Sequence, residues 1–233
     1  MRTGRHRYLA AAAELANTLL VAMTIVGFFT ALFVGESVRG AVCFRYFTID
    51  SNILSAAASA VTAVFLLKGL RRGTPLPHFV LVLKYVGTVA VCLTFLTVCL
   101  FLGPTQGYDR MFSGSGLWLH LICPLLSAAS LLLLERGGTL ARSEVLLGMI
   151  PMAVYGAVYT AMVLIAKVWP DFYGFTRGGL WYVSWLLMLA GTLAICTILA
   201  LLYKYPRGDG GTAPSSADAH TEAAEEKQSG GSL

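Results

Sequence analysis

Long apolar stretches separated by short polar segments make up most of the chain before about residue 204. A helix needs about 20 apolar residues to cross the hydrocarbon core of a bilayer, at a rise of about 1.5 Å per residue. Six runs rich in Leu, Ala and Val reach that length without the alternation of half-buried strands. They are residues 10 to 34, 43 to 67, 79 to 102, 115 to 134, 144 to 166 and 180 to 203. Because lipid leaves no backbone partner outside the chain, we predict an all-α, polytopic bundle of six transmembrane helices.

The two ends of the chain differ from this bundle in composition. Residues 1 to 9 form a basic N-terminal segment, and residues 10 to 204 form the transmembrane domain. Residues 205 to 233 contain almost no large apolar side chain, and this composition is typical of a disordered tail.

The overall composition also favours a membrane protein. Hydrophobic residues make up 57% of the 233 residues and charged residues 12%, whereas soluble domains carry about 25% charged residues. The net charge of +5 comes from short basic clusters beside apolar stretches, so it indicates membrane topology and no nucleic-acid partner. The five cysteines occur singly in apolar segments and the four histidines lack ligand spacing, so we expect no metal site and no organic cofactor.

Lys and Arg residues are unevenly divided between the two sets of loops. One set and the chain termini hold Arg2, Arg5, Arg7, Lys68, Arg71, Arg72, Arg136, Arg142, Lys204 and Arg207. The other set holds Arg39, Arg110, Lys167 and Arg177. Since the richer side faces the cytoplasm in most membrane proteins, we predict a multi-pass cell-membrane protein with both termini cytoplasmic. Membrane lipids are its expected partners, and the sequence leaves the oligomeric state open.

Polar side chains are costly inside membrane helices, so each one is a candidate functional residue. The richest group begins the second predicted span and consists of Arg45, Thr48, Asp50, Ser51 and Asn52. Thr48 and His120 each lie about five residues past the start of a span, roughly 7 to 8 Å below the same boundary. A hydroxyl needs an adjacent base to act as a nucleophile, and a neutral histidine is the usual one. Thr48 and His120 are therefore the candidate nucleophile and base.

The same residues have other possible roles. Thr48 would also bond to its own helix backbone, and His120 would also bond to a neighbouring helix. Asn52 or Ser51 is a candidate donor to an oxyanion. Asp50 lies about 200° around the helix from Thr48, so it would orient His120 or, as we favour slightly, form an ion pair with Arg45.

Two tyrosines extend the candidate site. Tyr155 and Tyr159 share one face of the fifth predicted span, one turn apart. They would line the cavity of the candidate pair or bond between helices. Pro151 is expected to kink the same helix and open space beside the fourth span.

Two further charges lie within predicted spans. Glu14 and Lys84 are each about one and a half turns from the predicted cytoplasmic boundary. We expect a structural pair or a snorkelling lysine rather than a functional site.

Three runs of the sequence resemble a known family: FRYFTIDSNIL, LHLICPLL and IPMAVYGAVYTAMVLIAKVWPDFYGF. Their specific features are a basic-aromatic-aromatic-Thr motif ending at Thr48, a His-Pro pattern at His120 and Pro124, and the pair Trp169 and Pro170. Over roughly residues 10 to 203 the chain resembles the androgen-induced and androgen-dependent-TFPI-regulating family and its bacterial six-span relatives. Animal members are intramembrane threonine hydrolases that cleave fatty acid esters of hydroxy fatty acids. The resemblance implies that Thr48 is the nucleophile and His120 the base. Asp50 departs from the bacterial pattern, which usually has Gln there.

The leading functional hypothesis is therefore an intramembrane hydrolase that cleaves a fatty-acyl lipid ester near the outer leaflet. The alternatives are a small-solute transporter that uses the polar start of the second span, and a non-catalytic membrane assembly protein whose polar residues hold helices together.

Overall fold

The computed structural model describes residues 2–33, 40–72, 74, 76–135 and 139–204. Within these ranges the chain forms helices and connecting segments without a strand, which confirms the all-α prediction for the described residues. The predicted tail, residues 205 to 233, and the tip of the N-terminus lie outside them.

The elements follow one another with short connections. They are α1 (Arg2–Phe33), η1 (Gly40–Arg45), α2 (Phe47–Arg72), α3 (His78–Thr97), η2 (Val98–Leu102), α4 (Gly103–Gln106), α5 (Tyr108–Met111), η3 (Leu117–Ile122), α6 (Cys123–Ala129), η4 (Ser130–Leu134), α7 (Arg142–Leu147), α8 (Ile150–Thr160), η5 (Ala161–Ile165), η6 (Arg177–Gly179) and α9 (Trp181–Lys204). Segments η1 and η6 are 3₁₀-helices, and η2 to η5 are π-helices that continue α-helices.

Five segments of the described chain are long and apolar enough to cross a membrane. They are Phe47–Leu70, His78–Gln106, Leu117–Leu134, Arg142–Ile165 and Trp181–Lys204. These segments coincide with the second to sixth predicted spans and agree with a multi-pass helical membrane protein. The first predicted span also lies in a helix, α1, but the apolar stretch identified there, Ala11–Val26, is shorter than the other five.

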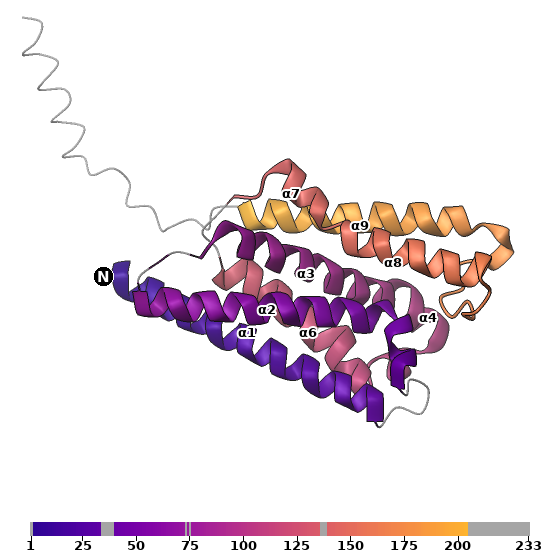
Figure 1. The fold of residues 1–233 in the computed structure, drawn as a ribbon, viewed down its shortest axis with the longest axis horizontal. Coiled ribbons are helices and arrows are strands. Elements are labelled where there is room, and N and C mark those ends of the chain that lie inside the picture. The colour runs from indigo at the N-terminus through magenta and orange to yellow at the C-terminus, as the bar shows by residue number, and fades with distance from the viewer. Residues whose placement is uncertain (1, 34–39, 73, 75, 136–138, 205–233) are drawn as a thin grey trace, which may run out of the picture.

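The long helices lie side by side along the long axis of the molecule, with α3 in the middle (Figure 1). Helix α3 contacts α2 and α6 on one side and α8 and α9 on the other. A Cβ atom on Gly87 of α3 would lie 3.0 Å from the Cα of Ser55, so the backbones of α2 and α3 approach closely there. The α3 span is the most buried of the five, whereas α8 and α9 expose many Leu and Val side chains, as expected for lipid-facing helices.

The beginnings and ends of several helices meet at one end of the bundle, on the right in Figure 1. Here η1 leads into α2, η2 follows α3, and the connection between η5 and α9 turns the chain back. We call this end the Thr48 end, because Thr48 is the second residue of α2. The candidate site lies here.

The fifth predicted span is interrupted near its start. Helix α7 ends at Leu147, and α8 begins at Ile150 with Pro151 in its first turn. A proline is accommodated in the first turn, because its missing N–H would have no partner within the helix. The interruption of the predicted span just before Pro151 agrees with the expected break at this proline, whereas the expected opening of space beside the fourth span stays a prediction.

Candidate functional site

Thr48 and His120 meet at the Thr48 end. The Thr48 Oγ1 atom lies 3.3 Å from His120 Nε2, although 72 residues separate the two along the chain. Thr48 comes from the first turn of α2 and His120 from the π-helix η3. The equal depth expected from the sequence therefore corresponds to a hydrogen-bonding contact.

The other ring nitrogen of His120 fixes how the ring is protonated. His120 Nδ1 lies 2.7 Å from the backbone carbonyl oxygen of Met111. Because a carbonyl oxygen only accepts hydrogen bonds, the neutral ring carries its proton on Nδ1. The lone pair of Nε2 then faces the Thr48 hydroxyl, as a general base requires.

The helix that carries His120 is a π-helix rather than an α-helix, and the covalent structure of Pro124 explains this. Pro124 has no backbone N–H, so the carbonyl of His120 cannot accept the usual α-helical hydrogen bond four residues on. The turn widens instead, and the Cys123 N–H donates to the Trp118 carbonyl, five residues earlier. Such π segments are frequent at functional sites.

Gly116 makes room for the contact between His120 and Met111. A Cβ atom at Gly116 would lie 2.2 Å from the Met111 oxygen and 3.3 Å from His120 Nδ1. Since 2.2 Å is far inside van der Waals contact, any larger residue would push the Met111 carbonyl away from the ring.

Under the hydrolase hypothesis drawn from the sequence, we predict that Gly116→Ala lowers ester turnover by about 10²-fold, because small displacements of a catalytic group have effects of that size. The measurement is ester hydrolysis by purified protein, with thermal unfolding followed in parallel. Ser115→Ala, one residue earlier, is the matched control and should retain activity. Full activity of Gly116→Ala would show that the Met111 carbonyl does not position His120.

Asn52 joins the two helices that carry the pair. Its Nδ2 donates to the Thr48 carbonyl at 2.7 Å and to the Leu119 carbonyl at 3.0 Å. Both amide protons are thus engaged with the backbone of Thr48 and of the residue before His120. Asn52 therefore holds the start of α2 against η3, and in this structure its N–H groups are engaged in these bonds.

Ser51 also lies beside Thr48 but faces α3. Its hydroxyl lies 3.2 Å from the Thr48 carbonyl oxygen and 2.8 Å from the hydroxyl of Thr94. These contacts engage Ser51 between α2 and α3, so it too is a weak candidate for the oxyanion donor.

The backbone N–H of Thr48 itself is a better candidate. The preceding N–H, of Phe47, donates to the hydroxyl of Tyr173, and those of Ile49 and Asp50 donate to the Tyr46 carbonyl. Within the described ranges, no acceptor is found for the N–H of Thr48. It lies in the first turn of a long helix, where free N–H groups and the helix dipole favour negative charge.

A cavity of about 580 Å³ opens beside Thr48, within the range of about 300 to 1,000 Å³ typical of ligand pockets. It lies between the start of α2, the η2 region, α8 and α9, and its walls are mostly apolar. Lining residues include Thr48, Thr94, Phe101, Tyr155, Tyr159 and Met188.

Both predicted tyrosines line this cavity and also bond to other segments. The Tyr155 hydroxyl donates to the Arg45 carbonyl at 2.6 Å, and the Tyr159 hydroxyl donates to Asp171 at 2.8 Å. Their rings stack with centroids 6.0 Å apart. The two roles considered for these tyrosines therefore coexist.

Asp171, which is not among the residues predicted from the sequence, organises the loop that leads to α9. Its carboxylate accepts hydrogen bonds from the N–H of Phe175 at 2.8 Å and from the N–H and hydroxyl of Thr176 at 2.7 and 2.6 Å. Partial burial opposes ionisation, but these hydrogen bonds and that of Tyr159 hold the pKa of Asp171 below its ordinary value. The Asp after Pro170, a common turn pattern, was the available sequence signal.

We predict that this loop loosens at low pH. A carboxyl group with a lowered pKa stabilises the folded state above the unfolded pKa of about 3.9, and this contribution disappears as the pH falls through the folded pKa. Hydrogen exchange at Phe175 and Thr176, corrected for intrinsic rates, should be constant from pH 7 to 5 and accelerate below about pH 4. In Asp171→Asn these amides should exchange faster already at pH 7, and unchanged protection in that variant would contradict the assignment.

The predicted ion pair between Asp50 and Arg45 is not formed. The Arg45 guanidinium lies over the ring of Trp169, 5.9 Å from its centroid. Among the described residues, no ion pair or hydrogen bond engages the Asp50 carboxylate.

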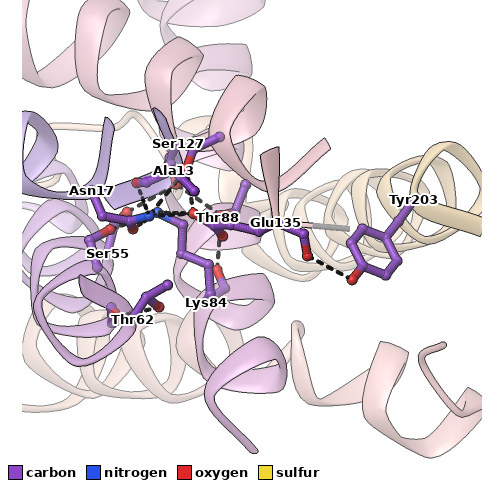
Figure 2. Close-up of polar contacts among 12 residues, drawn as sticks. Ala13, Asn17, Ser55, Thr62, Lys84, Thr88, Ser127, Glu135 and Tyr203 are labelled. Atoms are coloured by element: carbon purple, nitrogen blue, oxygen red, sulfur yellow. Dashed lines mark hydrogen bonds and ion pairs between the residues drawn. The ribbon is translucent and has the colours of Figure 1, made fainter. Parts of the chain in front are cut away.

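The charge on α3, Lys84, is buried in a cluster of polar side chains (Figure 2). Lys84 Nζ donates to Asn17 Oδ1 and to Ser59 Oγ, both at 2.7 Å, and lies 4.0 Å from Glu135 Oε1. Asn17 and Ser130 also donate to Glu135 Oε1. The side chains of Lys84 and Glu135 are both 0% exposed. The side chain of Glu14 lies outside the described part of the structure, so a pair of Glu14 with Lys84 stays a prediction.

Hydroxyl groups continue this polar interior toward the Thr48 end. The Ser127 hydroxyl lies 2.8 Å from that of Thr88 and 3.2 Å from that of Ser55 (Figure 2). These bonds join α2, α3 and α6. Within the described ranges, no group of three His, Cys, Asp or Glu side chains gathers as metal ligands would.

Comparison of the chain with protein-family models, with curated proteins and with solved structures found no significant match.

Proposed function

We propose that the protein is an intramembrane hydrolase that cleaves fatty-acyl lipid esters with Thr48 as nucleophile and His120 as base. The observation that carries the proposal is the 3.3 Å contact between Thr48 Oγ1 and His120 Nε2, with the opposite ring nitrogen bonded to the Met111 carbonyl. A nucleophile, a base and a group that orients the base are the three parts of an activated hydroxyl. The resemblance to the androgen-induced family of threonine hydrolases also supports the proposal. The nucleophile and base of that family correspond to Thr48 and His120.

The reaction proceeds in two halves. Thr48 Oγ1 attacks the ester carbonyl carbon while its proton passes to His120 Nε2. The tetrahedral intermediate collapses to an acyl-Thr48 ester, and His120 returns the proton to the departing alcohol. Water then attacks the acyl carbon with His120 again as base, and Thr48 leaves with the proton as the fatty acid is released. We assign the Thr48 N–H as one donor to the oxyanion of each intermediate.

The cavity beside Thr48 supports an acyl substrate. Its 580 Å³ are bounded mainly by apolar and aromatic side chains, and each methylene group of an acyl chain that enters from the lipid adds packing contacts with these walls. Longer acyl chains should therefore be cleaved with higher kcat/KM until the cavity is filled.

The proposal also includes the topology. We place six spans in the cell membrane, counting α1 as the first, with both termini in the cytoplasm and the Thr48 end toward the outer surface. The uneven division of Lys and Arg between the loops supports this orientation. The substrate would then enter from the outer leaflet.

The test is hydrolysis of fluorogenic 4-methylumbelliferyl esters by purified protein in lipid nanodiscs. The wild-type protein should release the fluorophore with a preference for long acyl chains. Thr48→Ala should lose at least about 10²-fold of this activity, whereas Thr48→Ser, which keeps a hydroxyl, should lose less. A transporter or an assembly protein would show no hydrolysis that depends on Thr48, and that outcome would refute the proposal.

A further inference from the structure

A second apolar groove lies on the other side of Phe47 and Tyr155. It has a volume of about 750 Å³ and lies between α2, α3 and the α7–α8 segment. Its walls include Phe47, Leu54, Phe79, Val86, Val154 and Tyr155.

The groove follows the helices from near the start of α3 toward the Thr48 end, and its length is close to the thickness of one leaflet. It extends along α3 from Phe79, in the first turn, to Val86, next to the close approach of Gly87 and Ser55. From there it continues along α2 to Asp50. With about 1.5 Å per residue, this path measures roughly 18 Å, compared with about 15 Å for half of a 30 Å hydrocarbon core. An aliphatic chain of lipid length fits such a path.

One carboxylate lies at the Thr48 end of this groove. Asp50 is the only charged residue among its lining residues. The neighbouring polar groups are already engaged, because Ser51 bonds to Thr94 and the Tyr155 hydroxyl donates to the Arg45 carbonyl. Asp50 is half-buried and, within the described chain, no side chain neutralises it. An unpaired carboxylate against an apolar wall is unfavourable, so it favours a positively charged partner.

We propose that this groove binds a single-chain cationic amphiphile, whose ammonium group pairs with Asp50 and whose aliphatic chain lies between α2, α3 and α8. The charge of Asp50 selects the head group, since a fatty acid would be repelled and a fatty alcohol would form only a neutral hydrogen bond. The apolar walls select a long chain over a small soluble amine.

This site is separate from the cavity beside Thr48. Phe47 and Tyr155 line both, and their rings, with centroids 5.1 Å apart, form the partition between them. The amphiphile site therefore does not depend on hydrolysis, and it can be tested in a protein without the proposed nucleophile.

The experiment measures binding of tritiated hexadecylamine to the full-length protein in nanodiscs of phosphatidylcholine, with empty nanodiscs subtracted. Unlabelled hexadecylamine should compete at least about tenfold more strongly than hexadecanol, which corresponds to about 1.4 kcal/mol, and palmitate should not compete. Asp50→Asn should lose this preference, Asp50→Glu should keep it, and Thr48→Ala should bind as the wild type does. The matched control is Asp109→Asn, which removes a carboxylate from the exposed helix α5.

A second variant tests the groove without altering Asp50. Val154 lies on α8, is 59% exposed and lines the groove, so Val154→Trp should fill it without disturbing the core. Binding of hexadecylamine should fall at least tenfold in this variant. Equal competition by amine and alcohol, or undiminished binding in both Asp50→Asn and Val154→Trp, would overturn the proposal.

Discussion

Replacing either Thr48 or His120 by alanine is expected to lower kcat/KM for long-chain ester hydrolysis by about 10²- to 10⁴-fold, and the double replacement should lower it no further than the more severe single one. The two side chains share one proton across the 3.3 Å contact, so removing either group ends the same step. Residues that act as one unit have strongly non-additive effects. The measurement is the full set of steady-state kinetics for wild type, both single variants and the double variant.

The control for these double-variant kinetics is an exposed threonine on another helix, away from the cavity. Thr197 on α9 bonds to the Leu193 carbonyl of its own helix, and Thr197→Ala should leave kcat/KM unchanged. Losses that add up in the double variant would mean that Thr48 and His120 act independently, contrary to the proposed mechanism.

The second large effect concerns folding rather than chemistry. Lys84→Met is expected to reduce the free energy of unfolding by about 3 to 5 kcal/mol, because it leaves Glu135 as an uncompensated buried charge. Glu135→Gln should have a comparable effect through Lys84. The double variant Lys84→Met/Glu135→Gln should recover most of the lost stability, since a buried ion pair adds little over neutral residues of similar size.

Unfolding in detergent solution, followed by circular dichroism, would measure these differences. The exposed pair of His78 and Glu144, 2.7 Å apart, provides the comparison, and His78→Gln should change stability little. The double variant could instead lose as much free energy of unfolding as the two single variants lose together. The cluster would then owe its stability to packing or to the bonds of Asn17 rather than to charge compensation.

Hydropathy alone was sufficient to predict the second to sixth helical segments, because a membrane-spanning helix needs a long apolar run and little else. The contact of Thr48 with His120 could also be predicted from the sequence, because the apolar runs give the depth of each residue in its helix. Two residues at the same depth on helices of the same direction can touch if the helices are neighbours, and the resemblance to threonine hydrolases pointed to the same pair.

The groups that orient His120 were not predictable in this way. Its partner is a backbone carbonyl, and any residue could supply one, so the identity of Met111 carried no signal. Gly116 matters only because the chain folds back within 2.2 Å of where its Cβ would be. The widening of η3 depends on Pro124. A proline within a helix is equally compatible with an ordinary kink, so its presence in the sequence does not predict a π-helix.

The ion pair predicted for Asp50 paired it with the nearest opposite charge along the chain. In the structure the Arg45 guanidinium lies over the ring of Trp169 instead. Lys84 lies in a structural pair, as one of its two predicted roles required, and its partner among the described residues is Glu135, one residue past the end of a predicted span. Charge pairing within a bundle depends on which helices are neighbours, and that information is tertiary.

Labelling with a fluorophosphonate probe, followed by mass spectrometry of the modified peptide, tests the central claim most directly. Such probes modify hydroxyl groups that an adjacent base has activated. The wild-type protein should carry one adduct, on Thr48, and His120→Ala should be labelled at least about 10²-fold more slowly. Absence of an adduct on Thr48, or labelling that persists in Thr48→Ala, would contradict the assignment of this residue as the nucleophile.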